Sequence, residues 1–454
     1  MKKYFTYLSV LLFLSSCGVL SNYKPEKEVS SNLYGEKELP TDTLNNISKL
    51  SWRELFKDTI LQGLIEKGLE NNIDLKTTQL KVEEAHQVAR VAGAIAYLPS
   101  VSLTPQGTLA GTYVDAPSKT YNLAATVNWE LDILTKVNER KNTKALYQQA
   151  KDYEQAVKTQ LIAQIASTYY NLLMLDTQLS ISEEMLSSAK KMLSSTKALM
   201  EAGTGTDVAV AQMEASCRSI EVSVLSLKEA INKTENLMSL LLAETPHRIE
   251  RGKLEEQIFP DEVFVGVPLD ILGNRPDVRM AEHALEAAFY ATNKARASFY
   301  PSINLTGATG WTNTTGTEIF NPGEFLWKAV GTLTQPLFQK GQLVAKLKIA
   351  KAQQEEAKLA FHKSLLQAGI EVNEAMEKYQ TSSQKAIALE SQVKSMERAY
   401  RATSLLMDYG NTTYLEVLSA QQNYLSAQLT QVSNNVDRID GIISLYQALG
   451  GGQE

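Results

Sequence analysis

The sequence predicts a mainly α-helical protein whose β-hairpins form a small membrane part. Three observations predict it: two very long helical segments, two segments in which apolar and polar residues alternate, and a repeat of this order within the chain. Helices of ordinary globular domains have only three or four turns. The chain has 454 residues, a net charge of −6 and no basic cluster, so nucleic acid is not an expected partner.

The N-terminus has the pattern of a bacterial lipoprotein signal. A basic start precedes a short apolar core at 8–14, and small residues then lead to Cys17. In such signals the chain is cleaved before the cysteine, whose thiol is acylated. We therefore expect a signal peptide at 1–16 and a lipidated polar tether at 17–50; a plain signal peptide with a chance cysteine is the alternative. The sequence has no second run of about 18 apolar residues, so no transmembrane helix is predicted.

The first half of the mature chain, 51–245, combines helices with one hairpin, and its first helix is expected from Trp52 to Leu69. After Pro99 the apolar period changes from 3.6 to 2 until about residue 132. Each strand has about 11 or 12 residues, enough to span a bilayer when tilted, although a half-exposed soluble hairpin fits the same pattern. From 133 to 202 there is no glycine or proline, and apolar residues recur in steps of four and three, a coiled-coil period. This helix reverses at 203–206.

The second half, 271–449, repeats the first a little more than 200 residues later. Its hairpin is expected at about 301–338, and its long helix from residue 342 is on the order of 100 Å long at about 1.5 Å per residue. Segment 246–270 links the repeats and 450–454 is a tail. Four strands cannot close a barrel, and open edges do not survive in a bilayer, so a barrel must be shared between subunits.

Two motifs carry a family resemblance. Residues 267–279 read Val-Pro-Leu-Asp-Ile-Leu-Gly-Asn-Arg-Pro-Asp-Val-Arg, with Ala281-Glu282 after them, and 414–421 read Tyr-Leu-Glu-Val-Leu-Ser-Ala-Gln. With them, the chain resembles the TolC-like outer membrane efflux proteins, in the lipoprotein branch that serves resistance-nodulation-division pumps. The signature residues are Pro268, Arg275, Pro276, Asp277, Arg279 and Glu282. Proline suits a first helical position and aspartate a helix N-terminus, so we expect a structural motif.

The resemblance implies a homotrimer in the bacterial outer membrane, with a twelve-stranded pore and a long periplasmic α-helical barrel. It implies a passive exit duct for drugs or other small toxic compounds, which works with a periplasmic adaptor protein and an inner membrane pump. Lipid on Cys17 would be the only added group, and no cofactor is expected. Adaptor contact is expected at the two tips, that is, at Gly203, Thr204, Gly205, Gly410, Asn411 and Thr412.

The resemblance also places Glu416 and Ser419 at two pore-facing gate positions, where the family carries acidic residues. A ring of Glu416 carboxylates would favour cations, and Ser419 at the second position would weaken that preference. A solvated helix charge is the alternative for Glu416. At the first tip Ala209 stands where Glu416 stands in the second. We therefore expect no tip salt bridge.

No catalytic or metal site is predicted. The four histidines are dispersed, no nucleophile motif or paired carboxylates emerge, and Cys217 is expected to pack between helices. The chain is therefore not expected to be an enzyme. The alternative function is a lipid-anchored periplasmic coiled-coil scaffold or adhesion protein without a pore, which leaves the alternating hairpins unexplained.

Overall fold

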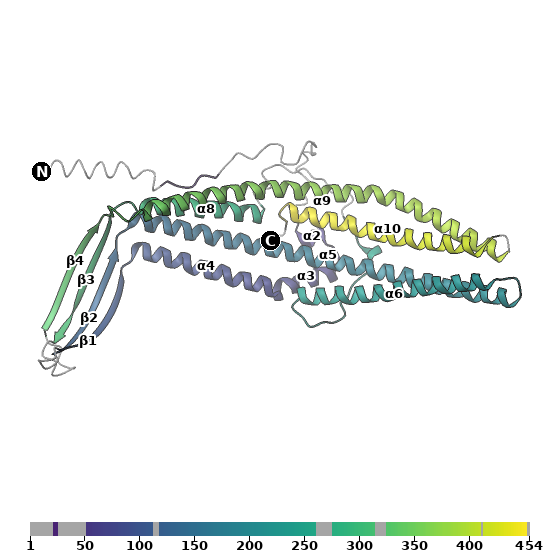
Figure 1. Cartoon of the computed structure of the whole chain (residues 1–454), viewed down its shortest axis with the longest axis horizontal. Coiled ribbons are helices and arrows are strands. Elements are labelled where there is room, and N and C mark those ends of the chain that lie inside the picture. The colour runs from purple at the N-terminus through teal and green to yellow at the C-terminus, as the bar shows by residue number, and fades with distance from the viewer. Residues whose placement is uncertain are drawn as a thin grey trace. The chain divides into compact units, whose positions relative to one another are not determined.

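The computed structural model describes residues 21–25, 51–111, 118–259, 275–313, 324–409 and 412–451. Figure 1 shows the elements along the chain. In order they are α2 (Trp52–Leu55), α3 (Thr59–Asn71), α4 (Ile73–Tyr97), β1 (Ser100–Ala110), β2 (Ser118–Glu130), α5 (Ile133–Glu201), α6 (Asp207–Leu241), η3 (Leu254–Glu256), α8 (Pro276–Ala297), β3 (Ser302–Asn313), β4 (Glu324–Thr334), α9 (Gln342–Asp408) and α10 (Tyr414–Ala448). The expected fold class, mainly α with β-hairpins, is confirmed.

The first of two compact units holds all four strands. It comprises Met1–Lys27, Leu80–Asp152 and Arg279–Lys363. The strands form one antiparallel sheet in the order β1-β2-β3-β4, so the two hairpins pair through β2 and β3. Helix α8 packs beside this unit's part of α5, where the Asn142 side chain donates to the Ala287 carbonyl at 2.7 Å.

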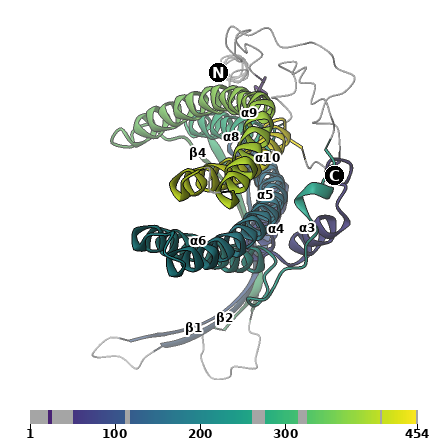
Figure 2. The ribbon, with the colours of Figure 1, turned by 90° about the vertical axis from the view of Figure 1, so that its right-hand side faces the viewer.

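The second unit is helical. It comprises Glu28–Gln79, Tyr153–Val278 and Ser364–Glu454. Two helical hairpins make up most of it: α5 lies along α6, and α9 lies along α10 (Figure 2). Between the hairpins lies a buried cluster of Met185, Ala189, Cys217 and Ile220, against which Leu186, Leu193, Tyr424 and Leu425 pack. Cys217 is thus a packing residue, as expected.

Two element boundaries differ from the sequence expectation. The predicted helix from Trp52 to Leu69 is divided into α2 and α3, because the Asp58 side chain caps α3 by accepting from the Ile60 backbone at 2.8 Å. Strand β4 ends at Thr334, before the expected Phe338. Pro336 follows it, and a proline has no N–H to continue the ladder.

None of the described helices is long and apolar enough to cross a membrane.

Candidate channel surfaces and gate

The sheet has one apolar and one polar face. Directly opposed residues point to the same face, so the register joins Leu123 with Trp311, and Trp311 with Phe325, on one side. Trp311 and Phe325 meet edge to face, with ring centroids 5.5 Å apart. The apolar side chains of this face are largely exposed: they include Val101, Leu103, Leu109, Leu123, Val127, Trp129, Ile303, Leu305, Trp311, Phe325, Trp327 and Leu333. Such a face needs an apolar surrounding.

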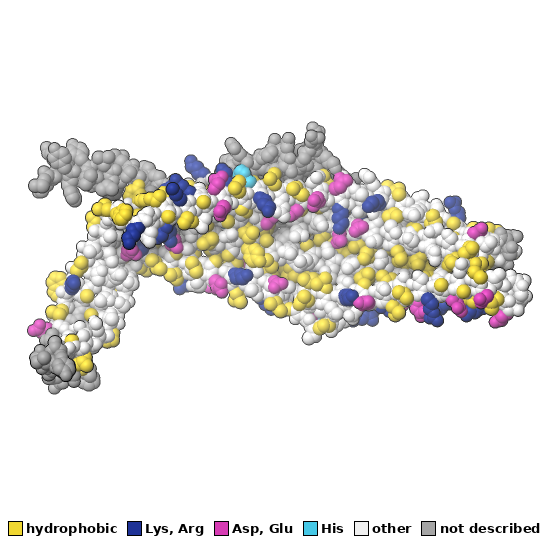
Figure 3. Space-filling model, viewed as in Figure 1, with side chains coloured by type: hydrophobic (Ala, Val, Ile, Leu, Met, Phe, Trp, Pro, Cys, Tyr) yellow, Lys and Arg dark blue, Asp and Glu magenta, His cyan; other side chains and the backbone are white. Residues whose placement is uncertain are grey.

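The other face carries hydroxyl and amide groups that bond across the strands. The Ser102 and Thr126 hydroxyls lie 2.7 Å apart, and the Thr312 hydroxyl donates to the Asn122 side chain at 2.5 Å. Charged side chains are sparse over the strands and frequent along the helices in the view of Figure 3. Leu326 and Val330 of β4 interrupt the polar face, which is why this strand alternates less regularly than the others.

Both outer edges of the sheet are open in the described part of the chain. Strands β1 and β4 stand at the ends of the strand order, and no described strand pairs with their outer sides. Unpaired edge N–H and C=O groups are strong templates for pairing with another strand. The outer sides of β1 and β4 can therefore pair with further strands.

The N-terminal segment is attached to the unit that holds the strands. The Lys141 ammonium of α5 donates to the Asn22 side chain at 2.7 Å, and Tyr23 meets Phe289 of α8 edge to face with centroids 5.8 Å apart. Cys17 lies outside the described residues. An extended chain covers about 3.5 Å per residue, so the four-residue step from Cys17 to Ser21 reaches about 14 Å at most.

The first tip is a tight reversal that uses two glycines. Gly203 has φ of 80°, a left-handed conformation that favours glycine. Thr204 and Gly205 both donate backbone N–H groups to the Leu199 carbonyl, at 3.0 and 2.9 Å. A side chain on Gly205 would come within 2.7 Å of the Met200 nitrogen. The next helix starts at once, because the Thr206 hydroxyl accepts from the Ala209 backbone at 3.2 Å.

The second tip is described only in part. Gly410 and Asn411 lie outside the described residues. The Thr412 hydroxyl donates to the Glu416 carboxylate, which lies in the first turn of α10. Glu416 and Ser419 are both exposed, whereas Val417 between them is fully buried. Residues three apart share a helix face, so the two gate candidates lie on one exposed face of α10.

The signature residues hold helix starts in place. Arg275 is 5% exposed and donates to the Ala448 carbonyl at 2.7 Å, to Asp277 at 2.8 and 3.0 Å, and to Glu371 at 2.5 Å. Burial alone would lower the pKa of Arg275, but its pairing with Asp277 and Glu371 raises it above the usual value. Pro276 opens α8. Among the signature residues, Arg275 and Asp277 make these bonds, and the structural role of the whole motif stays a prediction; Pro268 lies outside the described residues.

Arg279 and Glu282 belong to a charged cluster that sequence reasoning missed. Arg279 pairs with Asp152 of α5 at 2.6 Å. His283 lies between two carboxylates, with Nδ1 3.1 Å from Glu286 and Nε2 3.4 Å from Asp152. The hydrogen bond with Glu286 raises the pKa of His283 against the effect of burial, and burial raises the pKa of Glu282. In the sequence, the only local indication of this cluster was the spacing of three residues between His283 and Glu286.

A sheet with an exposed apolar face and two open edges, together with long helical hairpins, is typical of an outer membrane channel protein. Residues 64–243 and 267–451 match the model of the family described as outer membrane efflux protein. The chain therefore belongs to the outer membrane efflux protein family, and the match includes most of the first repeat and all of the second.

Named relatives align with nearly the whole chain. "Cation efflux system protein CusC" of Escherichia coli O6:H1 is 26% identical, over 98% of this chain and 97% of its own length. "Probable outer membrane lipoprotein SilC" of Salmonella typhimurium is also 26% identical, over 98% of each. "Toluene efflux pump outer membrane protein TtgI" of Pseudomonas putida is 27% identical, over 97% of each. A crystal structure of CusC matches with a TM-score of 0.82 at 25% identity, over 95% of this chain and all of that one.

Proposed function

We propose that this outer membrane efflux protein is the exit duct of a tripartite pump, a passive channel for drugs or other small toxic compounds. The sheet carries the proposal, because it has an apolar face, a polar face and two open edges. In lipid a sheet must close so that every backbone group is bonded. Four strands are fewer than the eight of the smallest bacterial barrels, so several copies must contribute. Three copies would supply twelve strands.

Insertion into planar lipid bilayers tests the duct. Purified protein is expected to give stepwise conductance, at rest or after the tips are loosened by mutation. Leu305→Lys on the apolar face of β3 should hinder insertion, since a lysine on the lipid-facing side of a barrel is unfavourable, by up to about 2–4 kcal/mol at the bilayer midplane. Thr306→Lys, one residue along on the polar face, is the matched control and should still insert. Absence of any conductance in every variant would favour a coiled-coil scaffold or adhesion protein.

We further propose that Glu416 lines the gate. Its carboxylate is exposed next to Ser419 on one face of α10, and a ring of such groups favours cations at a constriction. Glu416→Gln should reduce cation over anion permeability, and Ser419→Asp should increase it. Equal reversal potentials in the wild type and Glu416→Gln under a salt gradient would remove Glu416 from the gate.

The partners and the lipid follow from the same proposal. A periplasmic adaptor would contact the two tips, at Gly203, Thr204, Gly205, Gly410, Asn411 and Thr412, and an inner membrane pump of the resistance-nodulation-division type would drive the flux. Acylation of Cys17 would hold the N-terminus at the outer membrane, which suits the attachment of Asn22 and Tyr23 to the unit that carries the strands. Mass spectrometry of the mature protein should find a diacylglyceryl-type modification, and Cys17→Ala should lose it.

A further inference from the structure

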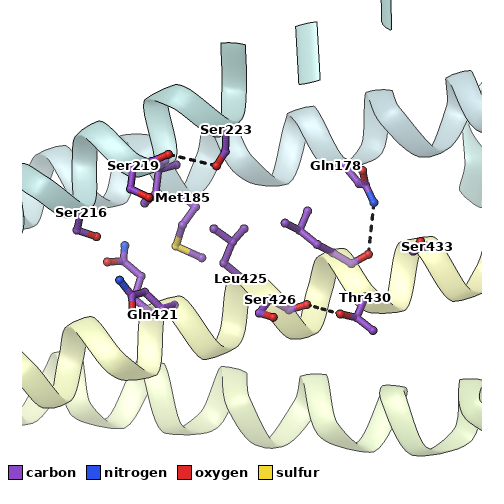
Figure 4. A pocket seen from close by; sticks show the side chains of 13 residues that line it. Gln178, Met185, Ser216, Ser219, Ser223, Gln421, Leu425, Ser426, Thr430 and Ser433 are labelled. Carbon is purple, nitrogen blue, oxygen red and sulfur yellow. Dashed lines mark hydrogen bonds between the residues drawn. The ribbon is translucent and has the colours of Figure 1, made fainter. Parts of the chain in front are cut away.

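A groove in the helical unit is lined by uncharged groups. It lies between α5, α6 and α10 and has a volume of about 530 Å³ (Figure 4). Gln178 and Met185 reach it from α5, Ile220 and the serines Ser216, Ser219 and Ser223 from α6, and the remaining side chains from α10. The full lining is Gln178, Met185, Ser216, Ser219, Ile220, Ser223, Gln421, Gln422, Leu425, Ser426, Leu429, Thr430 and Ser433.

Several of these polar groups are already satisfied. The Ser223 and Thr430 hydroxyls donate to carbonyls one turn earlier in their own helices, at 3.1 and 2.8 Å. The Gln178 amide donates across to the Leu429 carbonyl at 3.4 Å. These bonds use the hydroxyl donors of Ser223 and Thr430 and one of the two amide donors of Gln178.

Gln421 is different. Its side chain is 1% exposed, and within the described residues neither its amide oxygen nor its amide nitrogen has a hydrogen-bond partner. A buried amide can offer two donor hydrogens and two acceptor lone pairs, and leaving them all unpaired is costly. The groove it borders is the space from which a partner can come.

We propose that this groove binds an uncharged small molecule, which pairs an amide or hydroxyl group with Gln421 and rests its apolar part against Met185, Ile220 and Leu425. The proposal rests on the proposed function, in which such molecules pass along these helices. The volume is within the range of small-molecule sites, about 300–1,000 Å³. No charged side chain lines the groove among the described residues, so an ionised ligand would lose hydration without gaining a partner.

Equilibrium dialysis against the purified full-length protein in detergent tests this with a matched pair of probes. Chloramphenicol is uncharged and has an amide and two hydroxyls, and its succinate ester adds a carboxylate. Wild-type protein should bind chloramphenicol at least tenfold more tightly than the ester. Gln421→Leu, which keeps the side-chain volume and removes the amide, should weaken chloramphenicol binding at least tenfold. Gln384→Leu, an exposed position on α9 outside the groove, should bind as the wild type does.

A second variant covers the case in which Gln421→Leu fails to fold. Ser219 is an exposed lining residue, so Ser219→Tyr should fill the groove from its rim and abolish binding while thermal unfolding stays unchanged. Equal binding by the wild type and by folded Gln421→Leu would mean that only water pairs with Gln421, and would overturn the proposal. So would failure of the wild type to bind the probe, or equal binding of both probes.

Planar-bilayer conductance separates this proposal from the proposed function. A wild-type protein that conducts but binds no probe refutes the groove and leaves the duct standing. A protein that never conducts but binds chloramphenicol through Gln421 refutes the duct alone.

Discussion

The two repeats use different side chains to link the start of one helix to the end of another, α4 to α6 in the first repeat and α8 to α10 in the second. In the first repeat, the Asn72 amide donates to the Leu241 carbonyl at the end of α6, at 3.0 Å. At the matching position of the second repeat, the Arg275 guanidinium donates to the Ala448 carbonyl at the end of α10, at 2.7 Å. Both side chains are buried, at 6% and 5% exposure. The same link is thus made once by a neutral amide and once by a cation.

The cation brings requirements that the amide does not have. A buried guanidinium needs negative partners, and Arg275 finds them in Asp277 of its own motif and Glu371 of α9. Asn72 completes its bonding locally, since its oxygen accepts from the Leu75 backbone at 2.9 Å and caps α4. The Asn72 link therefore joins two elements, α4 and α6, whereas the Arg275 link joins three, α8, α9 and α10.

Arg275→Met should give the largest loss of stability. It leaves the Ala448 carbonyl and the Asp277 and Glu371 carboxylates without their common partner. We expect about 2–3 kcal/mol, below the 3–5 of a fully buried pair, because both carboxylates are 40% exposed. Chemical unfolding in detergent, followed by circular dichroism, measures it. Arg275→Lys keeps the charge but not the fork geometry and should fall between the two; equal stability of Arg275→Met and the wild type would show that the link contributes nothing.

Asn72→Ala should cost less, about 1–2 kcal/mol, since it removes one cap and one neutral hydrogen bond without stranding a charge. The same unfolding experiment measures it. Asn71→Ala is the matched control on the neighbouring residue, and it should stay within about 0.5 kcal/mol of the wild type. A larger loss for Asn72→Ala than for Arg275→Met would reverse the ranking of the two links.

The smallest expected effect is a pH dependence found in one repeat alone. His283 stands eight residues after Arg275, where the first repeat has Leu80 eight residues after Asn72. The pKa of His283 is raised above 6.5 by Glu286 and Asp152. Its protonated form is therefore favoured by folding, so its contribution is complete below pH 6.5 and is lost as the pH rises through the folded-state value.

Unfolding of His283→Gln between pH 5.5 and 8.5 measures this contribution. The stability difference from the wild type should be largest at the acid end and should shrink as the pH rises. His247→Gln, at a half-exposed histidine that lies 3.5 Å from Glu244, is made in parallel to show what a histidine-to-glutamine change does elsewhere in the chain. The acidic side chains that act on His283 are Asp152 on α5 and Glu282 and Glu286 on α8. A difference for His283→Gln that grows with pH would contradict the assigned sign.

The fold could be predicted because its elements are local. A period of 2 or 3.6 is a property of neighbouring residues, so strands β1 to β3 and helices α5, α6 and α9 follow from it. The left-handed Gly203 was also predictable, since a reversal between two long helices needs such a residue. The Asp58 cap was visible in principle as an aspartate before an apolar run, and it divides the first helix.

The repeat, the alternating hairpins and the positions of the tips can all be predicted from the sequence, because each depends on spacing along the chain. The partners of the buried polar groups depend instead on how the helices pack. Arg275 meets Glu371 across 96 residues and Ala448 across 173, and no periodicity encodes such pairs. For the same reason the groove beside Gln421 became visible only in three dimensions: its walls come from three helices, and an unpaired amide is defined by what surrounds it.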